Sequence, residues 1–315
     1  MALDSGTVPV HGLHHVTAIA GDPRENLAFY TGVLGMRLVK RTVNQDAVDT
    51  YHFFYADAAG TPGTDLTFFP WPRMAVGKRG TGLADEIGLA IPAGTLDDWS
   101  ARLQSFSVEA SRVEGPFAES ALRFRDPHGL RLALVEIHED RGFEAWSESP
   151  VAEDRQIRGL HSVCLWQADP ARTAEFLTDS MGLHSVGTEG GRHRLAAEDG
   201  RSGMFVDLHE PSDPARGRWG PGTVHHVAWR QRDEEEELEL RDSLEQAGFQ
   251  PTPVIDRFWF KSVYFREPGG VLFELATEGP GFTADEELEH LGESLILPPW
   301  LEARRTEIEA GLPAV

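Results

Sequence analysis

Val224-His225-His226-Val227-Ala228-Trp229 and its counterpart Leu13-His14-His15-Val16-Thr17-Ala18 decide how this chain folds. Each sets a doubled histidine into a short run of residues that favour β-strands. Because neighbouring side chains of a strand point to opposite faces, one histidine of each pair can face a common interior. Glu274 places a carboxylate in the apolar run Val271-Leu272-Phe273-Glu274-Leu275-Ala276, where an unpaired charge would be costly. Two imidazoles and one carboxylate on strands predict a shared metal site.

The chain also repeats itself. Leu160-His161-Ser162-Val163 matches Leu13-His14-His15-Val16, and residues 178–183 match residues 31–36 at the same offset. Residues 265–270 likewise match residues 124–129. These matches predict a duplicated pair of βαβββ modules, four in all.

The first module is expected to have strands at residues 13–20, 36–42, 50–55 and 65–69, with a helix at 24–34 that begins after Asp22-Pro23 and ends at Gly35. For the second module we expect strands at 86–91, 121–125 and 130–137 and a helix at 96–106. The fourth should have strands at 224–229, 258–265 and 271–276 and a helix at 233–247. The run 234–237 is interpreted as a solvated helix face, 138–158 as a linker and 302–310 as a final helix.

The predicted fold is α+β, with four βαβββ modules that form two barrel-like cups. Since the candidate ligands come from the first and fourth modules, we expect one cup to join the two ends of the chain and the other to combine the second and third modules. By residue, 1–145 form the N-terminal half, 155–278 the C-terminal half, and 279–315 a tail that packs on the body.

Composition narrows the classes of partner. The 315 residues include 29 Lys and Arg against 51 Asp and Glu, a formal charge of −22, which disfavours nucleic acid and anionic membrane surfaces. No apolar run reaches the length of a membrane span. Met1-Ala2-Leu3-Asp4-Ser5 lacks the pattern of a secretory signal, and Cys164 is the only cysteine. We therefore expect a cytoplasmic protein.

Comparison of equivalent positions locates the site. At the ligand position of the first strand the four modules carry His15, Glu86, Ser162 and His226, and on the last strand Thr67, Ala133, Asp207 and Glu274. His15, His226 and Glu274 would leave coordination positions vacant, as in the facial triad of non-haem Fe(II) oxygenases. Without a histidine, Glu86, Asp207 and Ser162 are not expected to form a second site. Structural roles are assigned to His52, His128, His138, His161, His184, His193 and His209.

The combination resembles the vicinal oxygen chelate superfamily, which includes glyoxalases, bleomycin-resistance proteins and extradiol dioxygenases, and more narrowly its hydroquinone-type ring-cleaving dioxygenases. Further motifs of the resemblance are Tyr51-His52-Phe53 with Pro62-Gly63-Thr64, Asp256-Arg257 with residues 264–270, and Leu297-Pro298-Pro299-Trp300. The match covers nearly the whole chain.

The resemblance implies that His15, His226 and Glu274 bind Fe(II), with Mn(II) as the alternative, and that His14, Thr17, His225, Arg257 and Tyr264 surround the substrate. Thr17 shares a strand face with His15, whereas His14 and His225 require a bulge or a site at the strand ends. Arg257 would stabilise negative charge, His225 would transfer a proton and Tyr264 would hydrogen-bond a phenolate.

The expected reaction is ring cleavage of a hydroquinone or related aromatic diol by dioxygen. The alternatives are a glyoxalase-type isomerase or lyase, which would want a fourth ligand where Thr67 stands, and a non-catalytic protein that sequesters a small molecule, which needs no metal triad. Association into a homo-oligomer stays open.

Overall fold

The structure is a computed structural model that describes residues 8–315. Met1–Ser5, on which the expectation of a cytoplasmic protein partly rests, lie outside the described residues. The chain forms the four expected modules, each a strand, a helix and three further strands. Their helices are α1 (Pro23–Leu27), α2 (Leu96–Ser105), α3 (Pro170–Met181) and α4 (Glu234–Gln246), and α5 (Arg305–Gly311) ends the tail.

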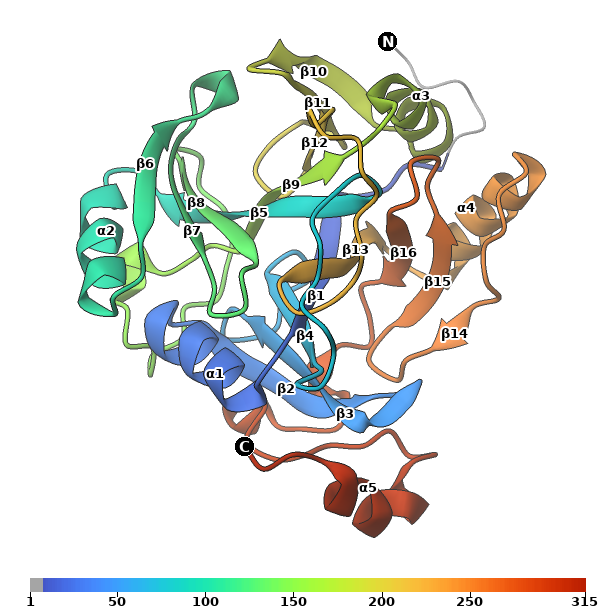
Figure 1. Cartoon of the computed structure of the whole chain (residues 1–315). Coiled ribbons are helices and arrows are strands. Elements are labelled where there is room, and N and C mark those ends of the chain that lie inside the picture. Colours follow the sequence, from blue (N-terminus) through green and yellow to red (C-terminus); the bar gives the residue numbers. More distant parts are fainter. Residues whose placement is uncertain (1–7) are drawn as a thin grey trace.

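The strands form two curved eight-stranded sheets (Figure 1). The first sheet combines the fourth and first modules in the order β14 (Ile255–Asp256), β15 (Lys261–Arg266), β16 (Leu272–Thr277), β13 (Thr223–Gln231), β1 (Leu13–Ala20), β4 (Asp65–Pro70), β3 (Ala47–Ala56), β2 (Arg37–Asn44). The second combines the third and second in the order β10 (His184–Glu189), β11 (Arg192–Ala196), β12 (Phe205–His209), β9 (Leu160–Trp166), β5 (Leu83–Pro92), β8 (Arg131–Ile137), β7 (Ser120–Arg125), β6 (Ala110–Glu114). The predicted pairing of modules is confirmed.

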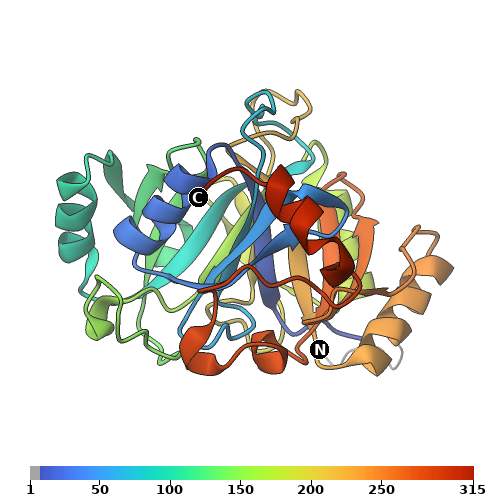
Figure 2. The same cartoon turned by 90° about the horizontal axis from the view of Figure 1, so that it is seen from below.

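The middle of each sheet joins two modules through an antiparallel pair of their first strands, β1 with β13 and β5 with β9. These strands carry residues such as Val16, Val227, Ile87 and Val163, all fully buried in one hydrophobic core that spans both sheets. In a view from below, the helices lie at the periphery and the sheets in the middle (Figure 2). The cups therefore share their apolar packing, and each keeps a concave inner face.

Both central strand pairs contain bulges, at positions that bear on the site. Between Leu13 and His15 strand β1 advances two residues while β13 advances one, so His14 is the extra residue. Between Thr17 and Ala18 the surplus is on β13, at His225. Asp85 and His161 are the extra residues of the β5–β9 pair. A bulge re-aims the side chains beside it, so strict alternation alone does not fix where the doubled histidines point.

Several boundaries differ from the expected ones. Asp22 caps α1 by accepting bonds from the amides of Arg24 and Glu25, but the helix continues from residue 28 to 33 as a π-helical turn. The strand expected at 258–265 begins later, at Lys261: residues 257–260 form a turn between β14 and β15, in which Phe258 adopts φ +78°. Strand β6 was not expected, because Ala110–Glu114 alternates weakly and is mostly exposed.

The tail packs on the first module. Leu297, Leu301 and Ile308 form a buried cluster with Val43 of β2. Lys40, also on β2 and fully buried, donates to Asp285 and Glu286 of the tail. Residues 279–315 therefore brace the outside of the first sheet.

Helix α4 departs from the expected solvated face. Glu234 and Glu235 are exposed, but Glu237 is fully buried, and neither of its carboxylate oxygens has a hydrogen-bond partner among the described residues. Burial, with smaller contributions from Glu274 and Glu234, raises the pKa of Glu237 to about 8. The carboxyl group of Glu237 thus keeps its proton up to about pH 8 in the folded protein, whereas in the unfolded chain it loses the proton near its ordinary pKa of 4.5.

Glu237→Gln is therefore expected to stabilise the protein increasingly as pH rises. Because the folded-state pKa is raised, the carboxyl group carries no penalty below about pH 4.5 and a growing one up to about pH 8, on the order of 2–4 kcal/mol. Urea unfolding of both proteins between pH 5 and about pH 8.5 measures the difference. A difference that stays constant with pH would contradict the assignment.

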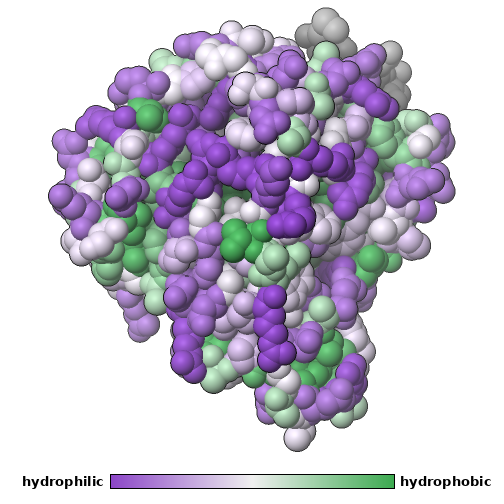
Figure 3. Space-filling view, in the orientation of Figure 1, coloured by the Kyte–Doolittle hydropathy of each residue, from purple (hydrophilic) through white to green (hydrophobic). Residues whose placement is uncertain are grey.

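The face of the molecule in Figure 3 is mostly hydrophilic, with small separate apolar patches. No helix within residues 8–315 is long and apolar enough to cross a membrane.

Candidate metal centre and its cavity

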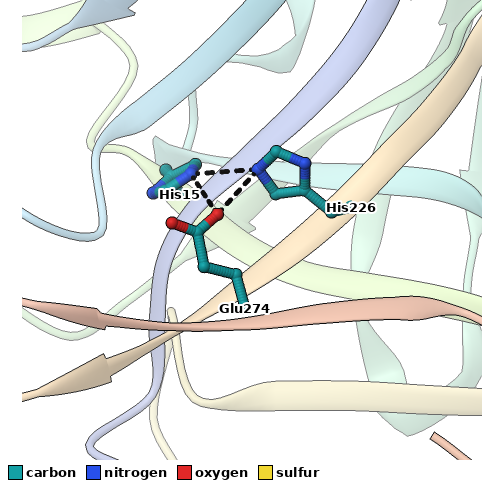
Figure 4. Close-up of side chains that lie close together, drawn as sticks. All are labelled: His15, His226 and Glu274. Atoms are coloured by element: carbon teal, nitrogen blue, oxygen red, sulfur yellow. Dashed lines mark hydrogen bonds and ion pairs between the residues drawn. The ribbon is translucent and has the colours of Figure 1, made fainter. Parts of the chain in front are cut away.

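Three buried side chains converge inside the first sheet. His15 comes from β1, His226 from β13 and Glu274 from β16, and Figure 4 shows them pointing toward one another. Their ligand atoms lie within 4.8 Å of one another. The Nε2 atoms are 3.3 Å apart, and Glu274 Oε2 lies 3.3 Å from His15 Nε2 and 2.8 Å from His226 Nε2. The structure brings together the three residues chosen as candidate ligands.

The other ring nitrogen of His15 is held by the bulged histidine beside it. His14 Nε2 lies 3.1 Å from the carbonyl oxygen of Thr277, which can only accept, so this nitrogen donates. Burial and the neighbouring His15 lower the pKa of His14 to about 3, so the ring is neutral and its Nδ1 carries a lone pair. His15 Nδ1, 2.9 Å away, must then donate to it. In the neutral ring this directs the lone pair of His15 Nε2 toward Glu274 and His226.

His225 stands in the same relation to His226. The two Nδ1 atoms are 2.8 Å apart, and burial together with His226 lowers the pKa of His225 to about 3. Its ring stacks on Trp219, with centroids 4.3 Å apart and planes at 21°. The indole fixes the plane of the ring, whereas no carbonyl among residues 8–315 fixes its tautomer as Thr277 does for His14.

Glu274 is charged despite being fully buried. Burial alone would raise its pKa, but positive charge beside it, as on the protonated imidazoles of His15 and His226, holds the pKa well below its usual value. Ser262 donates to Oε1 at 2.6 Å, while Oε2 receives no well-directed hydrogen bond from the part of the chain that the structure describes, although both Nε2 atoms are close. This oxygen is thus aimed at the gap between the imidazoles.

A cavity with an empty volume of about 380 Å³ opens on these three side chains. The rest of its lining is aromatic or polar. It consists of Phe54, Phe69, Trp259, Phe260, Tyr264, Asn44, Gln45, Asp46, His52 and Arg257. The cavity suits a flat ring with polar substituents.

Arg257 and Tyr264 lie together on one side of the cavity. The guanidinium carbon of Arg257 is 5.3 Å from the ring centroid of Tyr264, and Nη2 is 3.0 Å from Asp46 Oδ2. Tyr264 packs edge-on against His226, with ring centroids 5.7 Å apart, and burial and Glu274 raise the pKa of its phenol. Arg257 in the tight turn at 257–260 and Tyr264 on β15 therefore place a cation and a neutral phenol beside the candidate metal centre.

Thr17 does not line the cavity, and neither does His14 or His225. Thr17 Oγ1 is 2.7 Å from Thr67 Oγ1, which in turn is 2.9 Å from His52 Nε2. His52, assigned a structural role from the sequence, does line the cavity. Thr17 and the fourth-ligand position Thr67 thus reach the cavity through His52.

The equivalent place in the second sheet is filled by ion pairs. Arg192 on β11 bridges Glu86 Oε1 at 2.9 Å and Asp207 Oδ2 at 3.4 Å, and Arg194 binds Asp207 at 2.7 Å and also Glu119. The guanidinium groups of Arg192 and Arg194 therefore lie between these carboxylates. Within residues 8–315, His15, His226 and Glu274 are the one cluster with metal-ligand geometry.

The chain is similar to known proteins along nearly its whole length. Residues 12–134 and 159–275 match the model of the Glyoxalase/Bleomycin resistance protein/Dioxygenase superfamily. The chain is 44% identical over 303 residues to a Bacillus subtilis protein named "Putative ring-cleaving dioxygenase MhqO", covering 96% of this chain and 95% of the relative. It is 34% identical over 310 residues to the chlorohydroquinone/hydroquinone 1,2-dioxygenase of Sphingobium indicum, covering 95% of each. A crystal structure titled as a "putative dioxygenase" from Bacillus subtilis superposes with TM-score 0.93 at 42% identity, covering 97% of both chains.

Proposed function

Because the chain belongs to the Glyoxalase/Bleomycin resistance protein/Dioxygenase superfamily, we propose that its first sheet houses an Fe(II)-dependent, extradiol-type ring-cleaving dioxygenase acting on a hydroquinone or related aromatic diol. The observation that carries the proposal is the convergence of two imidazoles and one buried carboxylate on a small aromatic cavity. The substrate class is supported by the name of the Sphingobium relative.

The donor set fits a divalent cation. With His15 Nδ1 donating to His14, the His15 Nε2 lone pair and the Glu274 carboxylate face each other at 3.3 Å. Lone pairs at this separation repel unless a cation or a proton lies between them. Two histidines and one carboxylate are also the ligands of non-haem Fe(II) oxygenases. Mn(II) suits the same set and is the alternative.

His15, His226 and Glu274 would hold the ion, and bound there it would bring a ring oxygen and dioxygen together at its open positions. We assign His14 and His225 to orienting the two ligand imidazoles, in keeping with their Nδ1 contacts of 2.9 and 2.8 Å. Arg257 offsets negative charge on the ring oxygen, and Tyr264, which stays protonated, donates a hydrogen bond to it. Phe54, Phe69, Trp259 and Phe260 exclude water.

A glyoxalase-type reaction is less well supported. Its fourth ligand would come from position 67, but the hydroxyl of Thr67 is engaged by Thr17 and His52. Simple sequestration of a ligand would give no reason for a buried Glu274 paired with two imidazoles.

Oxygen uptake by protein loaded with Fe(II) under anaerobic conditions tests the proposal. Hydroquinone and catechol are compared with a thiol hemiacetal, and the Zn(II)-loaded protein is the control because zinc is redox-inert. We expect the Fe(II) form to consume dioxygen with hydroquinone and the Zn(II) form not to. Isomerisation of the hemiacetal without oxygen uptake on either ring would instead establish the glyoxalase-type reaction.

A further inference from the structure

His52 is the one imidazole of the cavity wall that belongs neither to the three candidate ligands nor to the doubled histidines. It comes from β3, and its ring lies between Phe54 and Phe69, with centroids 3.9 and 4.4 Å away. Phe69 also faces His226, with centroids 6.4 Å apart. A ring bound against Phe69 would therefore have the candidate metal centre on one side and His52 on another.

The two nitrogens of His52 have different surroundings. Nε2 is bonded to the fully buried hydroxyl of Thr67, and that hydroxyl to the fully buried hydroxyl of Thr17. Within residues 8–315, Nε2 is the ring nitrogen of His52 that has a protein hydrogen bond. Since the side chain lines the cavity, we infer that Nδ1 is the atom offered to a bound ligand.

The ring is neutral. Burial, and then the neighbouring His15 and His226, lower the pKa of His52 well below its ordinary value. A neutral imidazole has one donor and one acceptor. If the hydroxyl of Thr67 donates to Nε2, Nδ1 carries the proton and donates to the cavity. If Nε2 donates to Thr67, which then donates to Thr17, Nδ1 accepts. The two hydroxyls can thus match His52 to either role of a ligand hydroxyl.

A para-diol needs a polar group of this kind on the protein. One of its hydroxyls lies at the bond to be cleaved, and the second is on the opposite side of the ring, out of reach of the same metal ion. Arg257 and Tyr264 stand on the side of the cavity next to His226 and Asp46. Resting on the proposed function, we propose that His52, held by the Thr67–Thr17 hydroxyl pair, binds the second hydroxyl of the aromatic diol and selects diols over monophenols.

The alternative is that His52 only fills space between Phe54 and Phe69. Packing alone needs no polar atoms, and phenylalanine would serve as well in a wall that is otherwise aromatic. An imidazole with one nitrogen anchored by a buried hydroxyl is the arrangement expected of a recognition group, because a polar site rejects a ligand that leaves it unpaired.

Anaerobic titration of the Fe(II)-loaded protein tests this assignment without turnover. Binding of hydroquinone and phenol is followed by calorimetry in the natural protein, His52→Phe, His52→Gln and Thr67→Val. We expect the natural protein to bind hydroquinone about tenfold more tightly than phenol, the effect of about one buried hydrogen bond. In His52→Phe the ratio should fall to about one, with the phenol affinity within about threefold.

The other variants separate recognition from packing. His52→Gln keeps hydrogen-bonding groups and should retain part of the preference, whereas Thr67→Val removes the anchor and should lose most of it. His184→Phe, the same change at an exposed histidine of the second sheet, should behave as the natural protein. Iron content and thermal unfolding verify that each variant is folded and loaded.

Two results would overturn the assignment while leaving ring cleavage intact: a tenfold preference that survives in folded His52→Phe, or a natural protein that consumes dioxygen with hydroquinone yet binds phenol equally well. Failure of the natural protein to consume dioxygen with any diol would instead overturn the proposed function, and this assignment with it.

Discussion

Glu274→Ala is expected to abolish both metal retention and turnover. The carboxylate is the one charged member of the cluster, is fully buried and lies within 3.3 Å of both imidazole Nε2 atoms. Loss of an outer partner of a metal ligand typically lowers metal affinity about 10- to 100-fold, so removal of a ligand should exceed about 100-fold. Metal content after purification, and the rise in Tm on adding metal, measure the effect.

Glu237→Gln is the matched control. Glu237 is equally buried but lies on α4 and does not line the cavity. The Glu237→Gln variant should bind metal and turn over substrate as the natural protein does. Glu274→Ala that retains bound metal would place the ion elsewhere, and an equal loss in both variants would indicate general damage to the first sheet.

The sequence reveals the cup arrangement because the repeat and the ligand set agree. Duplication predicts four modules, and ligands on the first and fourth require those modules to meet, as β1 and β13 do. The same comparison singles out His15, His226 and Glu274. Strand alternation could not place His14 and His225, because a bulge is a local surplus of one residue that depends on the partner strand.

The cavity wall was harder to predict. His52 is one histidine among 13, and its role depends on register: Phe54 pairs with Thr67 across β3 and β4, which brings His52, two residues away, onto the same face. The sequence signal that pointed toward His52 was Thr67, a weak ligand at a ligand position, which bonds to His52 in the structure. Glu237 was missed because a run of four glutamates hides the one that faces the core.

Arg257→Met is expected to lower kcat/KM for hydroquinone about 100- to 1,000-fold while leaving metal content unchanged. The side chain lines the cavity beside Tyr264 but is not among the clustered ligands. Loss of one preorganised donor to a developing negative charge typically costs a factor of this size. Arg257→Lys should recover only part of the activity, since a lysine offers no planar group to face both Tyr264 and Asp46.

Asp46→Asn separates the chemistry of Arg257 from its positioning. Asp46 holds Nη2 at 3.0 Å, but its side chain is 74% exposed, so the pair is screened by water and contributes little on its own. Meanwhile Gln45 donates to the carbonyl oxygen of Arg257 at 2.9 Å and fixes the turn independently. We therefore expect an effect below about threefold in kcat/KM, measured by oxygen uptake with hydroquinone. If Asp46→Asn proves as damaging as Arg257→Met, the position of Arg257 depends on Asp46, and the contact with Gln45 is not enough to hold the turn.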